Sequence, residues 1–98
     1  MANYVAAPEV GRDMAHLWDH IAAGDEGAAR RITAEILAAF ERLAEMPGLG
    51  HTRSDLTTQP LLFWPIRRRY FVIYRIRMGT IEIVRVLDGR RDVAALLG

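Results

Sequence analysis

The chain has 98 residues, a formal net charge of +1 and no cysteine, so it can form neither a disulfide framework nor a thiolate metal site. All thirteen basic residues are arginines, which excludes a lysine nucleophile or lysine general base. This length favours one domain spanning residues 1–98, and no apolar run is long enough to cross a bilayer. We therefore expect a cytoplasmic protein that does not associate with membranes.

The charge is divided unevenly along the chain. Residues 1–50 contain four arginines and eight acidic residues, whereas residues 51–98 contain nine arginines and four acidic residues. The net charge is therefore −4 in the first half and +5 in the second. The second half is the one suited to an acidic partner.

The first half predicts a short strand and two helices. Residues 3–7 can form an edge strand, and Pro8 suits the first turn of a helix, where its missing N–H would have no partner. Apolar residues then recur at helical spacing as far as Ile21. Asp25 should cap a second helix that ends before Pro47. On the exposed face of the first helix we expect the polar residues Glu9, Asp13, His16 and His20.

The second half predicts antiparallel strands. Residues 48–60 read as an exposed loop, and residues 61–66 as an edge strand, because Pro65 has no N–H to donate. A hairpin follows, with strands over residues 70–77 and 81–88 joined at Gly79. After it, Asp92 should cap one or two helical turns.

Strict alternation divides the second hairpin strand into two faces. It places Arg85 and Leu87 on one face with the isoleucines that precede them, and Val86 and Asp88 on the other. Together the elements imply an α+β fold, in which an N-terminal antiparallel helical hairpin packs on a small, mainly antiparallel sheet, followed by a short C-terminal helical turn.

Several separated segments resemble the ParE branch of the RelE/ParE toxins of bacterial toxin–antitoxin modules. The matching segments cover almost the whole chain, and their order and spacing carry the likeness: residues 17–22, 28–32, 40–47, 50, 53–56, 69–70, 73–75, 81–83, 85–87 and 90–92. The family fold, a helical hairpin on a curved antiparallel sheet, is the one that the periodicity also predicts.

The resemblance implies a small toxin that a cognate ParD-like antitoxin neutralises. Its expected target is DNA gyrase, and it would reach operator DNA only indirectly, through the antitoxin. Two alternatives stay open: a ribosome-dependent mRNA endonuclease of the RelE type, and a non-toxic member that only binds its antitoxin.

The catalytic alternative needs a general base for the 2′-hydroxyl and an acid for the leaving oxygen. RelE-type members place lysines, arginines and a tyrosine or histidine near the C-terminus, but this chain has no lysine, and no tyrosine or histidine follows Tyr74. We therefore expect inhibition by protein binding, with no catalytic residue, metal or cofactor. His16 and His20 have the spacing of a helical metal pair, yet they read more simply as surface residues.

Arginines dominate the expected binding residues, because their planar guanidinium groups hold carboxylates and phosphates in bidentate geometry. The alternative for the run at residues 67–69 is a solvated strand end, and for Trp18 a place in the core. For target binding we expect Arg75, Arg85, Arg90 and Arg91. For antitoxin binding we expect Trp18, Arg67, Arg68, Arg69, Tyr70 and Tyr74.

Overall fold

The computed structural model of the protein describes residues 3–98. In chain order its elements are β1 (Tyr4–Ala6), α1 (Pro8–Ala22), α2 (Glu26–Glu45), the 3-10 turn η1 (Pro47–Leu49), β2 (Leu62–Ile66), β3 (Tyr70–Arg77), β4 (Thr80–Asp88) and α3 (Val93–Leu97). The four strands form one sheet in the order β1-β4-β3-β2. Only β1 and β4 run parallel, so the predicted α+β class and mainly antiparallel sheet are confirmed.

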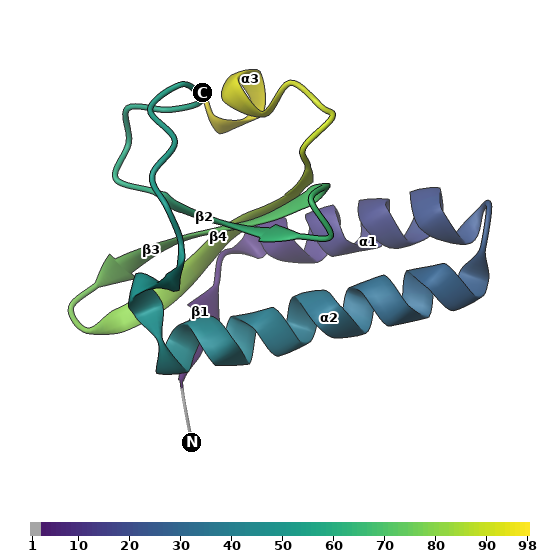
Figure 1. Cartoon of the computed structure of the whole chain (residues 1–98), viewed down its shortest axis with the longest axis horizontal. Coiled ribbons are helices and arrows are strands. Elements are labelled where there is room, and N and C mark those ends of the chain that lie inside the picture. The colour runs from purple at the N-terminus through teal and green to yellow at the C-terminus, as the bar shows by residue number, and fades with distance from the viewer. Residues whose placement is uncertain (1–2) are drawn as a thin grey trace.

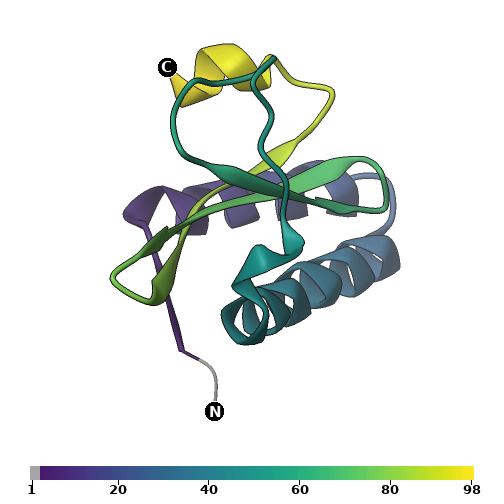
Figure 2. The same ribbon diagram turned by 60° about the vertical axis from the view of Figure 1, so that its left-hand side comes forward.

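The sheet is the middle of three layers. Helices α1 and α2 lie side by side on one face, while the loop after η1 and the short α3 lie on the other (Figures 1 and 2). Within residues 3–98 no helix combines the length and apolar character needed to cross a membrane.

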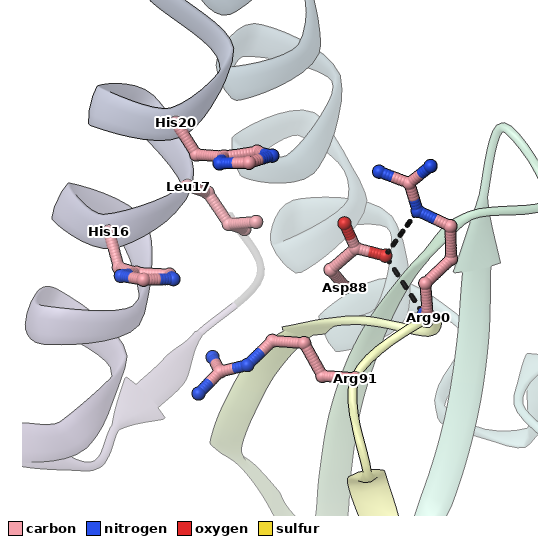
Figure 3. Close-up of a pocket in the computed structure, with 6 residues that line it drawn as sticks. All are labelled: His16, Leu17, His20, Asp88, Arg90 and Arg91. Carbon is pink, nitrogen blue, oxygen red and sulfur yellow. Dashed lines mark hydrogen bonds and ion pairs between the residues drawn. The ribbon is translucent and has the colours of Figure 1, made fainter.

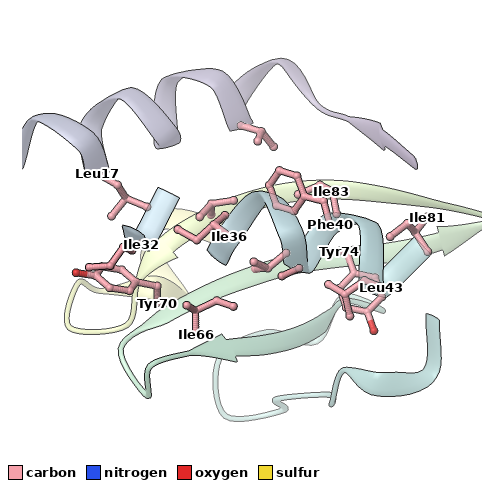
Figure 4. Packing of buried hydrophobic residues seen from close by; sticks show 14 residues of the cluster. Leu17, Ile32, Ile36, Phe40, Leu43, Ile66, Tyr70, Tyr74, Ile81 and Ile83 are labelled. Atoms are coloured by element: carbon pink, nitrogen blue, oxygen red, sulfur yellow. The ribbon is translucent and has the colours of Figure 1, made fainter. Parts of the chain in front are cut away.

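The predicted helix boundaries are confirmed. Helix α1 begins at Pro8, and Asp25 caps α2 by accepting a hydrogen bond from the Ala28 amide at 3.0 Å. The apolar stripe of α2 is buried against the sheet through residues such as Ile36 and Phe40 (Figure 4). The helical hairpin and the sheet therefore share one main core.

A second, smaller core lies on the opposite face of the sheet. Phe63, Ile73 and Leu87 contribute to it from the strands, and Val93 closes it from α3. Asp92 caps α3 as predicted, accepting from the Ala95 amide at 3.2 Å. The short C-terminal helix is thus anchored by burial at its first residue.

The predicted alternation in β4 is wrong beyond Ile83. Tyr74 pairs with Ile83 and Ile73 pairs with Arg85, so Val84 is an extra residue that forms a β-bulge. The bulge shifts the side-chain alternation by one residue and turns Val86 into the main core. The sequence pattern cannot reveal the bulge. With or without the extra residue at Val84, apolar side chains of β4 fall on both faces of the sheet.

The bulge also brings Arg85 to the edge of the sheet. Strand β1 pairs with β4 only as far as Ile83, and beyond it α1 crosses the uncovered edge. There Asp13 accepts from the Val86 amide at 3.0 Å and pairs with Arg85 through two contacts of 2.8 and 2.9 Å. The expectation that Asp13 is exposed is therefore wrong: it is only 6% exposed.

Arg85 links all three layers of the fold. Besides its pair with Asp13 on α1, its Nη1 donates to the Leu96 carbonyl on α3 at 3.2 Å. The side chain itself is largely buried, so its charge is compensated inside the protein.

Tyr74 fastens the segment after α2 to the sheet. Its hydroxyl donates to the Pro47 carbonyl at 2.6 Å and accepts from the Gly50 amide at 2.8 Å. A Cβ at Gly50 would lie 2.6 Å from that hydroxyl, so only glycine fits there. Burial raises the pKa of Tyr74, although its hydrogen bond with the Gly50 amide opposes the shift.

Replacing Asp13 by alanine should destabilise the fold strongly. The Asp13→Ala change leaves a largely buried guanidinium without its carboxylate and the Val86 amide without its acceptor. We expect the free energy of unfolding, measured by urea denaturation, to fall by about 3 kcal/mol.

Asp19→Ala is the matched control, because Asp19 is an exposed aspartate on the same helix and has no ion pair within residues 3–98. It should change stability by less than about 0.5 kcal/mol. Equal effects of the two substitutions would contradict the structural role given to the Asp13–Arg85 pair.

Candidate functional site

Arginines from three segments of the chain gather at the end of the sheet where β4 exits and β2 turns into β3. Asp88, the last residue of β4, is only 7% exposed and holds this region together. Its Oδ2 accepts from Arg69 at 3.1 and 3.2 Å, and its Oδ1 accepts from the Arg90 amide at 2.9 Å. The Arg90 side chain lies 3.7 Å from the same carboxylate.

Asp88 is held in its ionised form. Burial alone would raise its pKa, but the Arg90 amide and the Arg69 guanidinium outweigh burial and lower the pKa below its ordinary value. Asp88 therefore holds the Arg69 guanidinium and the Arg90 amide, while the side chain of Arg90 stays only loosely paired with it.

The three consecutive arginines of the β2–β3 turn point to different partners. Arg67 pairs with Glu35 on α2, with Nε 2.8 Å from Oε2, and this pair lowers the pKa of Glu35. Arg69 pairs with Asp88 and lies over the Tyr70 ring at 5.2 Å. Arg68 is exposed and has no ion pair within the described residues 3–98.

Two hollows flank Arg90 and Arg91. The first, of about 290 Å³, lies between α1 and the exit of β4. Figure 3 shows His16 and His20 projecting from α1 on one side and the two arginines on the other, with Leu17 and Asp88 between them. Two imidazoles and two guanidinium groups therefore border one hollow.

The second hollow, of about 210 Å³, lies on the other side of the same arginine pair. Its arginines come from three segments of the chain, and its apolar wall is formed by Leu56, Phe71 and Val93. We call the surrounding set the arginine cup: Arg53, Arg68, Arg69, Arg90 and Arg91.

The structure does not bring Arg75 and Arg85 to this region. Arg75 pairs with Glu82 at 2.6 Å towards the tip of the β3–β4 hairpin. Arg85 forms its ion pair with Asp13. Of the four arginines expected to bind the target, only Arg90 and Arg91 lie together on an open surface.

The aromatic residues expected to bind the antitoxin are mostly core residues. Tyr70 is 3% exposed and Tyr74 is fully buried, so neither offers a free surface in this state. Trp18 is half-buried on α1. The sequence-based expectation that Trp18 is accessible to a partner therefore stays open, whereas the two tyrosines position their neighbours.

Sequence reasoning missed Arg53 and Asp88 as members of this region. Arg53 lies in the long loop, where nothing in the pattern predicts its approach to the Phe71 ring at 5.6 Å. Asp88 lies on the helix-covered face only because of the bulge at Val84, which strict alternation does not predict. No group of three histidine, cysteine or acidic side chains suited to a metal occurs within residues 3–98.

A family model described as the ParE toxin of the type II toxin–antitoxin system, parDE, matches residues 4–93. The chain belongs to the ParE toxin family. Over 63 residues it is 41% identical to Toxin ParE3 of Caulobacter vibrioides, a match that covers 64% of this chain and 61% of that relative. The family resemblance drawn from the sequence is thereby confirmed.

A solved structure has the same fold as this chain. The chain superimposes with a TM-score of 0.74 on a chain of the chromosomal ParDE toxin–antitoxin system from P. aeruginosa. The superposition covers 90% of this chain and 96% of that one, at 16% sequence identity. At that identity the likeness concerns the arrangement of helices and strands alone.

Asp88→Asn should make stability less dependent on acid pH. A carboxylate with a lowered pKa contributes stability that is fully present above its unfolded value of about 4 and is lost as the pH falls through its folded value. We expect urea denaturation to give a variant about 2 kcal/mol less stable than the parent at pH 7, with the difference shrinking below about pH 4.

The exposed Asp19→Asn substitution serves as the charge-matched control and should lower stability at pH 7 by less than about 0.5 kcal/mol. A difference between parent and Asp88→Asn that persists unchanged to pH 2 would show that the ionised carboxylate does not contribute the stability.

Proposed function

We propose that this chain is a toxin that inhibits DNA gyrase by binding it, without covalent chemistry or a cofactor. Membership of the ParE family supports the toxin role. The proposed gyrase-binding surface is placed at Arg90 and Arg91, because this pair is exposed at the exit of β4 between two hollows. Arginine at such a place can hold carboxylates of a protein target in bidentate geometry.

A ParD-like antitoxin is the proposed neutralising partner, and contact with operator DNA would be made through it. Trp18, Arg67, Arg68 and Arg69 remain the residues proposed to bind it. Arg67 and Glu35 are each almost half exposed, so an acidic side chain of a partner can replace Glu35 at little cost. The proposed place of action is the cytoplasm, where gyrase and the antitoxin are made.

Charge complementarity gives the binding proposal its physical basis. Arg91 has no ion pair within the described part of the chain, and Arg90 shares Asp88 with Arg69. Their charges are therefore available to a partner without first breaking a strong internal contact. Arg75 and Arg85 would have to give up Glu82 and Asp13, and we propose that these two serve the fold instead.

The double substitution Arg90→Ala with Arg91→Ala should relieve growth arrest when the chain is produced in cells without an antitoxin. The concentration of purified protein that halves gyrase supercoiling should rise about tenfold or more, because both charge-assisted contacts are lost. The thermal unfolding midpoint should stay within a few degrees of the parent's, since both side chains are exposed.

Arg31→Ala with Arg42→Ala is the matched control. Both are exposed arginines on α2 that make no ion pair within residues 3–98, so the net charge changes equally. Full toxicity of a folded Arg90 and Arg91 double variant would contradict the assigned surface. Normal supercoiling at saturating concentrations of the parent would contradict gyrase as the target.

One observation supports a second candidate function, ribosome-dependent mRNA cleavage. The first hollow places His16 and His20 across from Arg90 and Arg91, which supplies an imidazole base beside cationic groups. One imidazole could take the 2′-hydroxyl proton while the 2′-oxygen attacks phosphorus, and the other, as imidazolium, could give a proton to the leaving 5′-oxygen. The arginines would stabilise the charge on phosphate.

Substitution of both histidines separates the two functions. His16→Gln with His20→Gln should leave supercoiling inhibition within about twofold of the parent, because a non-catalytic inhibitor needs no base. An endonuclease would lose mRNA cleavage by a factor of about 100 or more. Cleavage of mRNA that depends on these histidines, together with normal supercoiling, would replace the gyrase proposal.

A further inference from the structure

The turn between β2 and β3 has an unusual backbone for its sequence. Arg67 and Arg68 adopt φ angles of 55° and 56°, and the Arg69 amide closes the turn by donating to the Ile66 carbonyl at 3.1 Å. Two successive left-handed residues are the pattern of a type I′ turn, which strongly prefers Asn-Gly. A residue with a Cβ costs about 1–2 kcal/mol in that conformation.

The β3–β4 hairpin of the same sheet also has a turn with two left-handed residues, but there one of them is glycine. Met78 and Gly79 join β3 to β4 with φ angles of 51° and 79°, so glycine occupies the second position. Glycine at residue 68 would therefore satisfy the backbone equally well. The chain instead carries an arginine there, and strain of this kind is concentrated at functional sites.

The strained turn sends its first two side chains in different directions. Arg67 turns to α2, where Glu35 holds it. Arg68 lines the second hollow, together with the other members of the arginine cup. Close packing at this place also depends on Gly89, because a Cβ there would lie 2.9 Å from the Arg69 carbonyl oxygen and 3.1 Å from the Phe71 ring.

The charges of the arginine cup are only partly compensated. Asp55 holds Arg53 through contacts of 2.8 and 2.9 Å, and Asp88 holds Arg69. Arg68 and Arg91 have no ion pair within residues 3–98, and the side chain of Arg90 lies no closer than 3.7 Å to Asp88. Three cations thus surround a hollow that has an apolar wall.

The apolar wall favours a peptide over a nucleic acid. A base would need a free aromatic face, but Arg53 covers the Phe71 ring at 5.6 Å and Phe63 packs against it edge-on, also at 5.6 Å. The remaining apolar surface comes mainly from Leu56, because Val93 is only 3% exposed, and it suits an aliphatic side chain. A carboxylate next to an aliphatic residue matches both parts of the hollow.

We propose that the arginine cup binds an acidic segment of a protein partner, and that Arg68 is kept in its strained turn to complete this site. Carboxylates of the segment would meet Arg68, Arg90 and Arg91, and a neighbouring aliphatic side chain would lie against Leu56. The inference rests on the proposed function for the choice of a protein partner, but its test does not require gyrase.

The test is a substitution that should raise stability while weakening binding. Arg68→Gly introduces the residue that the turn prefers, so the thermal unfolding midpoint should rise by about 4 °C. Binding of the labelled peptide Asp-Glu-Leu-Asp-Glu, blocked at both ends and followed by fluorescence anisotropy, should weaken about tenfold through loss of one arginine contact. The neutral peptide Asn-Gln-Leu-Asn-Gln should not bind measurably.

Met78→Asn is the matched control, because it places a favoured residue in the other left-handed turn at a fully exposed position. It should also raise the unfolding midpoint but leave peptide affinity within twofold of the parent's. Failure of the parent to bind the acidic peptide, or equal affinity of Arg68→Gly and the parent, would overturn the proposal.

Binding of oligothymidylate, measured in the same way, tests whether the arginine cup binds nucleic acid instead of peptide. Binding of this probe that exceeds peptide binding and depends on Arg68 would also overturn the proposal. Because both probes are used without gyrase, a positive peptide result together with unaffected supercoiling would leave this site standing and would reject the proposed target alone.

Discussion

The ion pair between Asp13 and Arg85 is the contact on which the arrangement of the layers depends. Strand β1 leaves the edge of β4 unpaired after Ile83, and α1 covers that edge with a carboxylate that accepts from the Val86 amide. The same carboxylate holds Arg85, which reaches α3 on the opposite face. A largely buried pair of this kind contributes most by fixing one geometry, since loss of either partner leaves an uncompensated charge.

The β-bulge at Val84 makes that pair possible and also shapes the arginine-rich end of the sheet. Past the bulge, Asp88 points towards the helices, where it holds Arg69 and the amide of Arg90. Arg90 and Arg91 therefore leave the sheet between α1 and the long loop. The surfaces proposed for target and antitoxin adjoin there, so occupation by one partner would hinder the other.

The two hairpin turns differ in how well their residues suit the left-handed backbone. Both require left-handed residues, yet only the turn at Gly79 uses the residue that the backbone favours. The other turn contains Arg67, which pairs with Glu35 on α2, and Arg68, which lines the second hollow. Local sequence rules fail at this turn and hold along most of the chain, which is the behaviour expected where a site is maintained at the expense of stability.

The sequence by itself determined the α+β class, the helix boundaries at Pro8 and Asp25 and the family, because capping, helical periodicity and motif order are local signals. Only the tertiary structure decided the burial of Asp13 and the separation of Arg75 and Arg85 from Arg90. It also gathered His16, Arg53 and Arg68 around the strand exit. These outcomes depend on one inserted residue in β4 and on how α1 crosses the sheet edge, and neither leaves a periodic trace in the sequence.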